Sequence, residues 1–262
     1  MKALLSWIKR RLAYPVARDL DIDDLAANAV VRKIIREKIF LRRVYDAWYS
    51  ELATILPEQP SGPVLELGSG AGFMKDYIPG LITSEILHLP HVDLVLDAHH
   101  LPFEDASLRA VVMVDVLHHF SRMRYFLSEA ARCVKPGGVM AMIEPWHTPF
   151  SAFVYRHFHH EPFDPKTKDW HFPKGGPLSA ANMALPWIVF ERDRKIFEIE
   201  FPMWRIKSIR RHTPFAYLLS GGVAMRALVP DRSFDLCRKI EIKFAPWMDL
   251  TAMFATIVIQ RT

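Results

Sequence analysis

The stretch VLELGSGAGF, residues 64–73, places an apolar run directly before three glycines that are spaced two apart. In a helix or strand each glycine costs roughly 0.5–1 kcal/mol of stability relative to alanine. Three of them within five residues therefore indicate that something must come very close to the main chain at this point. The feature predicts a buried strand that ends in a ligand-binding loop.

On both sides of this glycine loop, short apolar runs alternate with loops or helical segments. The runs that we expect to be strands are PVLEL, LITSEIL, VDLVLDA, AVVMVDVL and VMAMIEP (63–67, 81–87, 92–98, 110–117 and 139–145). A helix with Ser121 as its N-cap should run to Val134, where KPGG ends it. WRIKSIRRH and MFATIVIQR (204–212 and 253–261) are expected to be the last two strands. Near-continuous hydrophobic strands separated by helices or loops indicate a parallel α/β sheet.

Acidic residues stand at the carboxyl ends of the expected strands, which is where parallel α/β sheets bind ligands. They are Glu66, Glu85, Asp97 and Asp115. Glu85 comes 17 residues after Gly68, a spacing that suits an acid holding a ribose diol. The loop reads GxGxG, so it differs from the GxGxxG of dinucleotide folds and lacks the Lys-Ser/Thr of a P-loop. The pattern therefore predicts a cofactor that contains a ribose.

From Pro63 to about Pro145 the chain resembles the class I S-adenosylmethionine-dependent methyltransferases, in particular their small-molecule, methyltransferase type 11-like group. The resemblance lies in VLELGSGAGF, ITSEIL, DAHHLPFEDASLRAVVMVDVLHHF and EAARCVKPGGVMAMIEP. It implies a Rossmann-like, seven-stranded, mostly parallel sheet with an antiparallel last hairpin, and S-adenosyl-L-methionine as the cofactor. The chain departs from the family pattern between Leu87 and Val92, where no crossover helix fits. We therefore expect a third strand that is short or displaced.

The resemblance also implies which residues contact the cofactor. The glycine loop would lie under its methionine and ribose portions, with Glu66 near the amino end. Glu85 would take both ribose hydroxyls, and Asp97 would accept a hydrogen bond from the adenine amino group. The full expected set is Glu66, Gly68, Ser69, Gly70, Gly72, Glu85, Ile86, Asp97, Ala98 and Asp115. Taken singly, Asp97 or Asp115 would also suit a helix cap, and Glu85 a surface position at a strand end.

A general base is needed only if the methyl acceptor is a hydroxyl or a poorly nucleophilic amine, because orientation and desolvation supply much of the acceleration. His118, at the end of the fourth expected strand, is the first candidate for this base. We expect it to face the methyl group while His119 packs behind it. Glu144 and His147, just past the fifth strand, are the second pair of candidates. The alternative role for His118 is packing or hydrogen bonding in the cofactor loop.

Residues 146–187 are rich in aromatic residues and histidine, and we expect them to form a substrate lid. Its apolar lining would come from Phe150, Phe153, Tyr155, Phe158 and Phe163. The segment's histidines raise a metal site as an alternative: His157, His159, His160 and His171. No cysteine or tight carboxylate set completes a ligand shell, so no metal is predicted. A second insertion, 213–249, is expected to help wall off a hydrophobic substrate pocket.

Residues 1–60 are predicted to be a helical extension of a methyltransferase domain at 61–262. One long helix is expected from Asp23 or Asp24 to the turn PEQPSGP. Its basic residues suit either a solvated face or a surface for an anionic substrate, a phospholipid headgroup or nucleic acid: Arg32, Lys33, Arg36, Lys38, Arg42 and Arg43. Residues 1–20 suit a peripheral membrane contact, with packing on the domain as the alternative.

The chain of 262 residues has two cysteines, 104 positions apart, and no apolar stretch near the roughly 18 residues of a membrane span. We therefore expect no disulfide framework, no zinc ribbon and no membrane span. The short apolar start before Lys9 does not suit a signal peptide. A cytoplasmic protein is expected, peripheral at most to the inner face of the membrane.

The predicted function is methyl transfer to a small-molecule or lipid- or glycan-linked acceptor, with O-methylation favoured. The basic N-terminal helices keep a nucleic-acid (RNA) methyltransferase as an alternative. Against it, DVLHHF stands where an Asn/Asp-Pro-Pro-aromatic element for base amino groups would follow the fourth strand. The other alternative is a non-catalytic, methyltransferase-like partner subunit, which a closed acceptor pocket would support.

Overall fold

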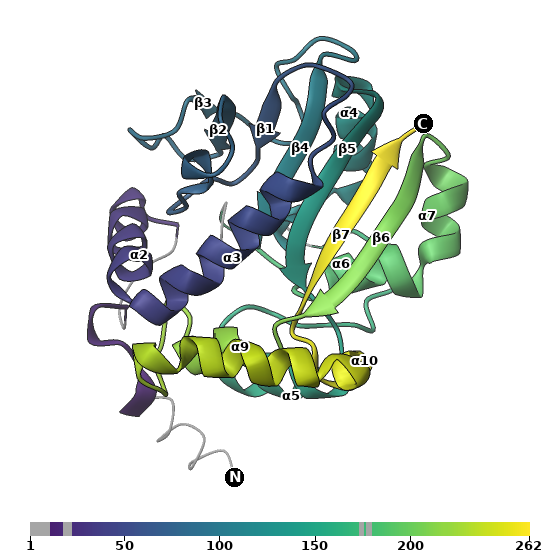
Figure 1. Ribbon diagram of the computed structural model, residues 1–262. Coiled ribbons are helices and arrows are strands. Elements are labelled where there is room, and N and C mark those ends of the chain that lie inside the picture. The colour runs from purple at the N-terminus through teal and green to yellow at the C-terminus, as the bar shows by residue number, and fades with distance from the viewer. Residues whose placement is uncertain (1–10, 18–22, 173–175, 177–179) are drawn as a thin grey trace.

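A seven-stranded sheet forms the centre of the computed structural model, which describes residues 11–17, 23–172, 176 and 180–262 (Figure 1). The strand order is β3-β2-β1-β4-β5-β7-β6. The strands are β1 Val64–Glu66, β2 Leu81–Glu85, β3 Leu94–Val95, β4 Leu108–Val114, β5 Val134–Pro145, β6 Trp204–His212 and β7 Phe254–Arg261. The first five pair in parallel, whereas β7 is antiparallel to both β5 and β6. The predicted fold class is therefore confirmed.

The edge formed by β2 and β3 is reduced, as the short spacing in the sequence predicts. Only two residue pairs join the strands, Ser84 with Leu94 and Glu85 with Val95. The connection between β2 and β3 holds no helix. Between β1 and β2 the only helical element is the 3-10 turn η2 (Met74–Asp76). Asp93 fixes this edge by accepting hydrogen bonds from the Thr83 amide at 2.9 Å and from Lys75 Nζ at 2.7 Å.

Helices cover both faces of the sheet because successive strand residues point to opposite sides. In β4, Val111 and Met113 belong to one core, whereas Ala110 and Val112 belong to the other. The helices on the first face are α4 Met123–Cys133, α6 Leu185–Trp187, the π-helical turn η4 Ile188–Arg192 and α7 Arg194–Glu200. On the other face α3 (Ile39–Ile55) crosses the strands (Figure 1). The protein is thus a three-layer α/β structure.

Further helices gather at the end of the sheet where β4 and β5 finish. Figure 1 shows α5, α9 and α10 side by side below this end. The elements in this group are α5 Pro149–Phe158, α8 Ala216–Ser220, α9 Phe234–Lys243 and α10 Met248–Thr251, with the short turns η1 Pro15–Ala17, η3 Leu117–His119, η5 Asp231–Ser233 and η6 Ala245–Trp247. Within the ranges that the structure describes, no helix has the length and apolar character needed to cross a membrane.

The N-terminal region forms two helices and not the single helix that we expected. Asp24 caps α2 (Leu25–Glu37) by accepting a hydrogen bond from the Ala26 amide. At Lys38 the backbone becomes extended, and α3 begins at Ile39. The break lets the buried Lys38 ammonium donate to the carbonyls of Gly222 and Met225. The proposed membrane contact falls mainly outside the described residues.

Two other details of the helices differ from the prediction. α4 begins at Met123, two residues after Ser121, and Arg122 holds its N-cap position without a capping side-chain bond. Several basic side chains of the N-terminal helices bond within the protein: Arg32 donates to the Gly72 carbonyl, and Arg43 pairs with Asp235. These two cations therefore have partners within the protein.

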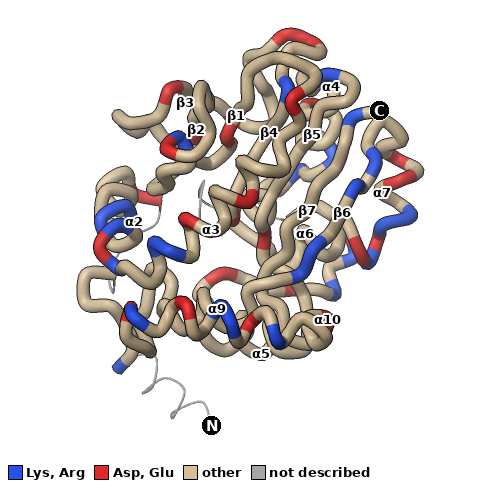
Figure 2. Tube along the Cα trace, viewed as in Figure 1, with Lys and Arg blue, Asp and Glu red and all other residues tan. Residues whose placement is uncertain are grey.

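Positive charge is also concentrated along β6 (Figure 2). Arg205, Lys207 and Arg210 are exposed on this strand, which forms one edge of the sheet. Exposed charges on an edge strand oppose pairing with a strand of another chain. This part of the positive charge therefore has a structural explanation.

Candidate active site

A cavity of about 720 Å³ lies at the carboxyl ends of β1, β2 and β4. Its size falls within the range of about 300–1,000 Å³ that is usual for small-molecule sites. All the residues that we expected to contact the cofactor line this one cavity: Glu66, Gly68, Ser69, Gly70, Gly72, Glu85, Ile86, Asp97, Ala98 and Asp115. The fold thus brings together residues that span 50 positions of sequence, from Glu66 to Asp115.

The glycine loop has backbone conformations that other residues rarely adopt. Gly68 has φ +64° and Gly70 has φ +41°. A Cβ atom on Gly68 would lie 2.5 Å from Val116 Cγ2, too close for any real contact. The bare backbone is therefore required in part by the protein's own packing, and it leaves the loop open toward the cavity.

Glu85 links the glycine loop to the end of β2. Its Oε2 accepts a hydrogen bond from the Gly70 amide at 3.0 Å, and its Oε1 accepts one from the Ile86 amide at 2.8 Å. Burial raises the pKa of Glu85, although these backbone donors oppose the rise. Each carboxylate oxygen keeps a second lone pair. The side chain is therefore fixed in position and can still accept hydrogen bonds from a diol.

Glu66 is buried at the end of β1. Burial raises its pKa to about 7; a hydrogen bond from Ser69 opposes this, and the nearby Glu85 adds to it. A cation beside this carboxyl would favour its ionised form. The carboxyl is therefore suited to a cationic group of a bound molecule.

Two buried polar atoms in the cavity wall have no hydrogen-bond partner among the described residues: Asn28 Oδ1 and His99 Nε2. His99 is held by Asp97, whose Oδ1 contacts His99 Nδ1 at 2.7 Å. Buried polar groups are usually satisfied, so these two atoms are available to bond to a molecule in the cavity. Sequence reasoning missed both residues, because Asn28 comes from the N-terminal helix α2 and His99 lies just past the predicted acid.

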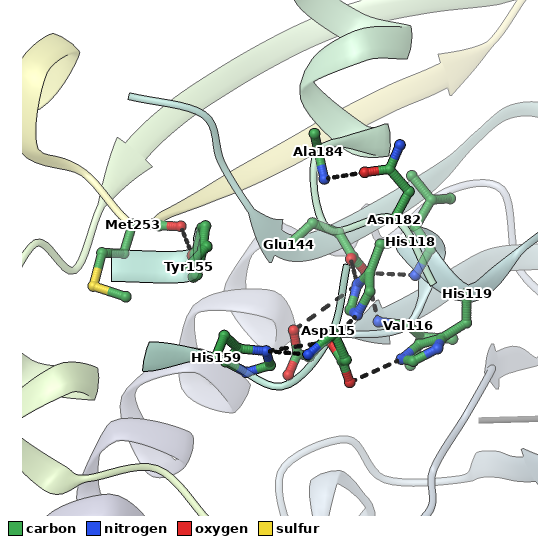
Figure 3. A network of polar contacts seen from close by, with 12 residues as sticks. Asp115, Val116, His118, His119, Glu144, Tyr155, His159, Asn182, Ala184 and Met253 are labelled. Atoms are coloured by element: carbon green, nitrogen blue, oxygen red, sulfur yellow. Dashed lines mark hydrogen bonds and ion pairs between the residues drawn. The ribbon is translucent and has the colours of Figure 1, made fainter. Parts of the chain in front are cut away.

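His118 lies behind the cavity wall, in a buried polar network (Figure 3). Its Nδ1 lies 2.9 Å from Glu144 Oε2, and its Nε2 lies 3.2 Å from Glu161 Oε2. Burial alone would lower the pKa of His118, but the hydrogen bonds to the two carboxylates raise it well above its ordinary value. Glu144 Oε1 also accepts hydrogen bonds from the amides of Val116 and Leu117, each at 2.8 Å.

The expected arrangement of the two adjacent histidines is wrong, because His119 and not His118 lines the cavity. His119 Nδ1 lies 3.1 Å from the carbonyl of Ala180. Burial and the charge of His118 lower the pKa of His119 to about 4. Neither Glu144 nor His147 lines the cavity: Glu144 is fully buried, and His147 stacks on Phe163.

The two predicted lid segments both reach the cavity. From 146–187 it is lined by Val154, Tyr155, Phe158, His159, His160 and Glu161, and from 213–249 by Tyr217, Leu218, Gly221, Gly222, Val223, Ala224 and Met225. Only two of the five aromatic residues that we expected to line the cavity do so, Tyr155 and Phe158. Phe150 packs on Phe215, Phe163 packs on Tyr155, and Phe153 is exposed.

The strand order, the glycine loop after β1 and the acid at the end of β2 agree with the class I S-adenosylmethionine-dependent methyltransferase domain that the sequence resembles. Residues 65–142 match the family model described as "Methyltransferase domain". This match agrees with the predicted family and with S-adenosylmethionine as the cofactor.

Three curated relatives are similar to parts of the chain. A probable phthiotriol/phenolphthiotriol dimycocerosates methyltransferase 2 from Mycobacterium ulcerans is 46% identical over 55 residues, which is 21% of each chain. A tRNA (carboxymethyluridine(34)-5-O)-methyltransferase from Arabidopsis thaliana is 32% identical over 136 residues, 42% of this chain and 33% of the relative. Demethylmenaquinone methyltransferase from Tropheryma whipplei is 28% identical over 147 residues, 49% and 62%. The chain thus spans less than two thirds of each relative.

Proposed function

We propose that this protein transfers the methyl group of S-adenosylmethionine to a small-molecule or lipid-linked acceptor. The observation that carries the proposal is a single cavity that is lined by all the expected cofactor residues and also by residues of both predicted lid segments. In this proposal residues 1–60 are an extension of the domain at 61–262, and the segments 146–187 and 213–249 form the acceptor side.

The cofactor supplies an electrophilic methyl group when it is bound. The chain's own residues hold it in the proposed scheme: Glu85 accepts from the ribose hydroxyls, Glu66 pairs with the amino end, and Asp97 with His99 contacts the adenine. Displacement at a sulfonium gains most from orientation and exclusion of water. In this proposal the lid segments contribute to both, because residues of 146–187 and 213–249 line the same cavity as the glycine loop.

Asp115 is the group that we assign to the acceptor's proton if the acceptor is a hydroxyl. It lines the cavity at the end of β4 and has φ +62°, a conformation uncommon for a residue other than glycine. Burial raises its pKa, with nearby His118 acting in the opposite direction. Glu144 and His118 would then act as positioning residues, since they fix the 116–119 turn that follows Asp115.

The acceptor side favours an apolar or amphipathic molecule. Val154, Phe158, Leu218 and Val223 line it, with polar groups concentrated at 115–121 and 159–161. The names of the mycobacterial and Tropheryma relatives, which refer to dimycocerosates and demethylmenaquinone, support the same class.

The test is calorimetric titration of S-adenosylmethionine and S-adenosylhomocysteine into the protein and into Glu85→Ala and Gly70→Val, with the exposed Glu104→Ala as control. We expect binding to the unaltered protein and to the control, and a loss of at least about tenfold, or 1.4 kcal/mol, in both site variants. Absence of binding to the unaltered protein would contradict the proposal and favour a non-catalytic subunit. A screen of lipid and quinone acceptors follows in the presence of the cofactor.

The tRNA-methyltransferase relative supports a second candidate, methyl transfer to RNA. The argument from sequence for an RNA methyltransferase was the basic N-terminal region. Three of the basic residues there, Arg32, Lys38 and Arg43, bond within the protein. Binding to RNA should weaken steeply as salt increases. Copurifying RNA with such a salt dependence, and methyl transfer to RNA but to none of the lipid or quinone acceptors, would select this candidate.

A further inference from the structure

Glu161 lies where the loop after β4 meets the loop after α5, and imidazole nitrogens surround its carboxylate. His118 Nε2 lies 3.2 Å from Oε2, and His119 Nε2 lies 3.8 Å from Oε1. His160 Nε2 approaches Oε1 to 3.6 Å from the exposed side. Figure 3 shows His118, His119 and His159 converging on one region, with Asp115 beside them. Sequence reasoning dismissed a metal because it considered only the histidines of 146–187.

The hydrogen bonds behind the two adjacent histidines decide which nitrogen faces Glu161. Ala180 offers only a carbonyl oxygen, so His119 Nδ1 must carry the hydrogen and donate it. In the neutral ring, His119 Nε2 then has a free lone pair. His118 Nδ1 faces the Glu144 carboxylate, which is itself held by two backbone amides. A carboxylate or carbonyl that orients the far nitrogen of an imidazole is the usual outer shell of a metal ligand.

Without a metal, His118 Nε2 and the Glu161 carboxylate share a proton, and a divalent cation bound by both would replace that proton. The lone pair of His119 Nε2 faces the same carboxylate at 3.8 Å. The three donors, two Nε2 atoms and one carboxylate oxygen, lie within 4.8 Å of one another. Two ligands at bond lengths of about 2.0–2.1 Å in a tetrahedral site are about 3.3 Å apart. His118 Nε2 lies 3.2 Å from Glu161 Oε2, and His119 Nε2 lies 3.8 Å from Oε1. Glu144 and Asp115 add negative charge nearby. The cluster therefore has the donors, spacing and charge that a divalent cation needs.

We propose that His118 Nε2, His119 Nε2 and the Glu161 carboxylate bind a divalent transition-metal ion of the Zn²⁺ type. Imidazole with one carboxylate favours such ions over Mg²⁺ or Ca²⁺. His119, His160 and Glu161 line the cavity, so the fourth position opens toward a bound molecule. A cation there would polarise an oxygen atom of that molecule. The assignment goes beyond methyl transfer and does not depend on it.

The test uses the full chain, stripped with a chelator and titrated with Zn²⁺ by calorimetry and with Co²⁺ by visible absorption. Glu161→Gln and His119→Gln remove one ligand each, while His157→Asn is the matched control, because His157 packs on Phe153 and belongs to no part of the cluster. We expect one equivalent of metal to bind the unaltered protein and the control, with the d–d bands of four-coordinate Co²⁺. Affinity should fall at least tenfold in both ligand variants, and Mg²⁺ should bind more weakly than Zn²⁺.

Failure of the unaltered protein to bind Zn²⁺ or Co²⁺ would overturn the site. Equal affinity in Glu161→Gln, or equal loss in His157→Asn, would also overturn it. Circular dichroism of each variant separates lost binding from lost folding, and the second ligand variant stands if one fails to fold. S-adenosylmethionine titrated into the same metal-free preparations tests the proposed function separately.

Discussion

The two sides of the cavity are built in different ways. The cofactor side comes largely from one continuous stretch, residues 64–98, which contains β1, the glycine loop and β2. The acceptor side is assembled from segments 115–122, 154–161 and 217–225, brought together over more than 100 positions of sequence. Local backbone conformation specifies the first side, whereas long-range side-chain contacts specify the second.

This difference explains why a motif is recognisable on one side only. A loop with φ values of +64° and +41° needs glycine at fixed positions, so its sequence is constrained wherever the loop is used. A wall such as the Tyr155 and Leu218 surface needs only apolar side chains of suitable size. The same contrast predicts that variants of the two sides separate into effects on cofactor binding and effects on acceptor binding or stability.

The largest effect on stability is expected in the buried network of Glu144 and His118, which lies behind the cavity wall. Glu144→Ala would leave the His118 imidazole without its main partner and the amides of Val116 and Leu117 without an acceptor. Breaking a buried pair in this way costs about 3–5 kcal/mol. Urea unfolding measures the loss. Glu104→Ala, an exposed acid outside the network, should leave the unfolding free energy unchanged, and a similarly small loss for Glu144→Ala would show that the network is not structural.

The same buried network shows which features of the site could not be predicted from the sequence. Most strand positions and the short β3 followed from hydrophobic patterns and spacing, and the ten cavity residues followed from the family resemblance; β5, however, begins at Val134, five residues before the expected strand. The orientation of His118 and His119 did not follow from either, because it depends on Glu161 and Ala180, more than 40 positions away. The helix break at Lys38 depends in the same way on carbonyls near residue 222. Contacts of this kind leave no local signal.

Lys38 offers a way to loosen the acceptor side alone. Lys38→Met keeps the length of the side chain but removes its hydrogen bonds to the carbonyls of Gly222 and Met225. We expect a loss of about 1.5–3 kcal/mol in unfolding free energy, typical of hydrogen bonds to a charged group. The KM for the acceptor should rise more than the Kd for S-adenosylmethionine.

The control is Lys33→Met, because Lys33 is exposed and pairs only at 3.8 Å with Glu37 among the contacts that the structure gives it. Lys33→Met should leave the KM for the acceptor and the Kd for S-adenosylmethionine unchanged. If Lys38→Met instead weakened the cofactor more than the acceptor, the division of the cavity into two sides would be wrong.

Gly68 and Gly80 form a matched pair for the cofactor side. Both have positive φ, but a Cβ on Gly80 meets nothing within 4 Å, whereas one on Gly68 would lie 2.5 Å from Val116 Cγ2. Alanine at either position carries a backbone cost of about 1–2 kcal/mol. Only Gly68→Ala should also displace the loop and weaken S-adenosylmethionine binding, by about tenfold or 1.4 kcal/mol, in calorimetry. Adding Val116→Ala should restore part of this affinity; no restoration would mean that the clash is not the cause.

The smallest predicted effect is a dependence of the cofactor side on pH. Burial raises the pKa of Glu66 from 4.5 to about 7, so the ligand-free folded protein holds a proton that the unfolded chain releases. This contribution to stability is complete below pH 4.5 and is lost as the pH rises toward 7. Binding of a cationic amino group needs the ionised carboxylate, so the affinity for S-adenosylmethionine should rise severalfold between pH 5.5 and 7.5. Titration of Glu66→Gln should show a flat profile over this range, and an unchanged slope would place the amino end of the cofactor away from Glu66.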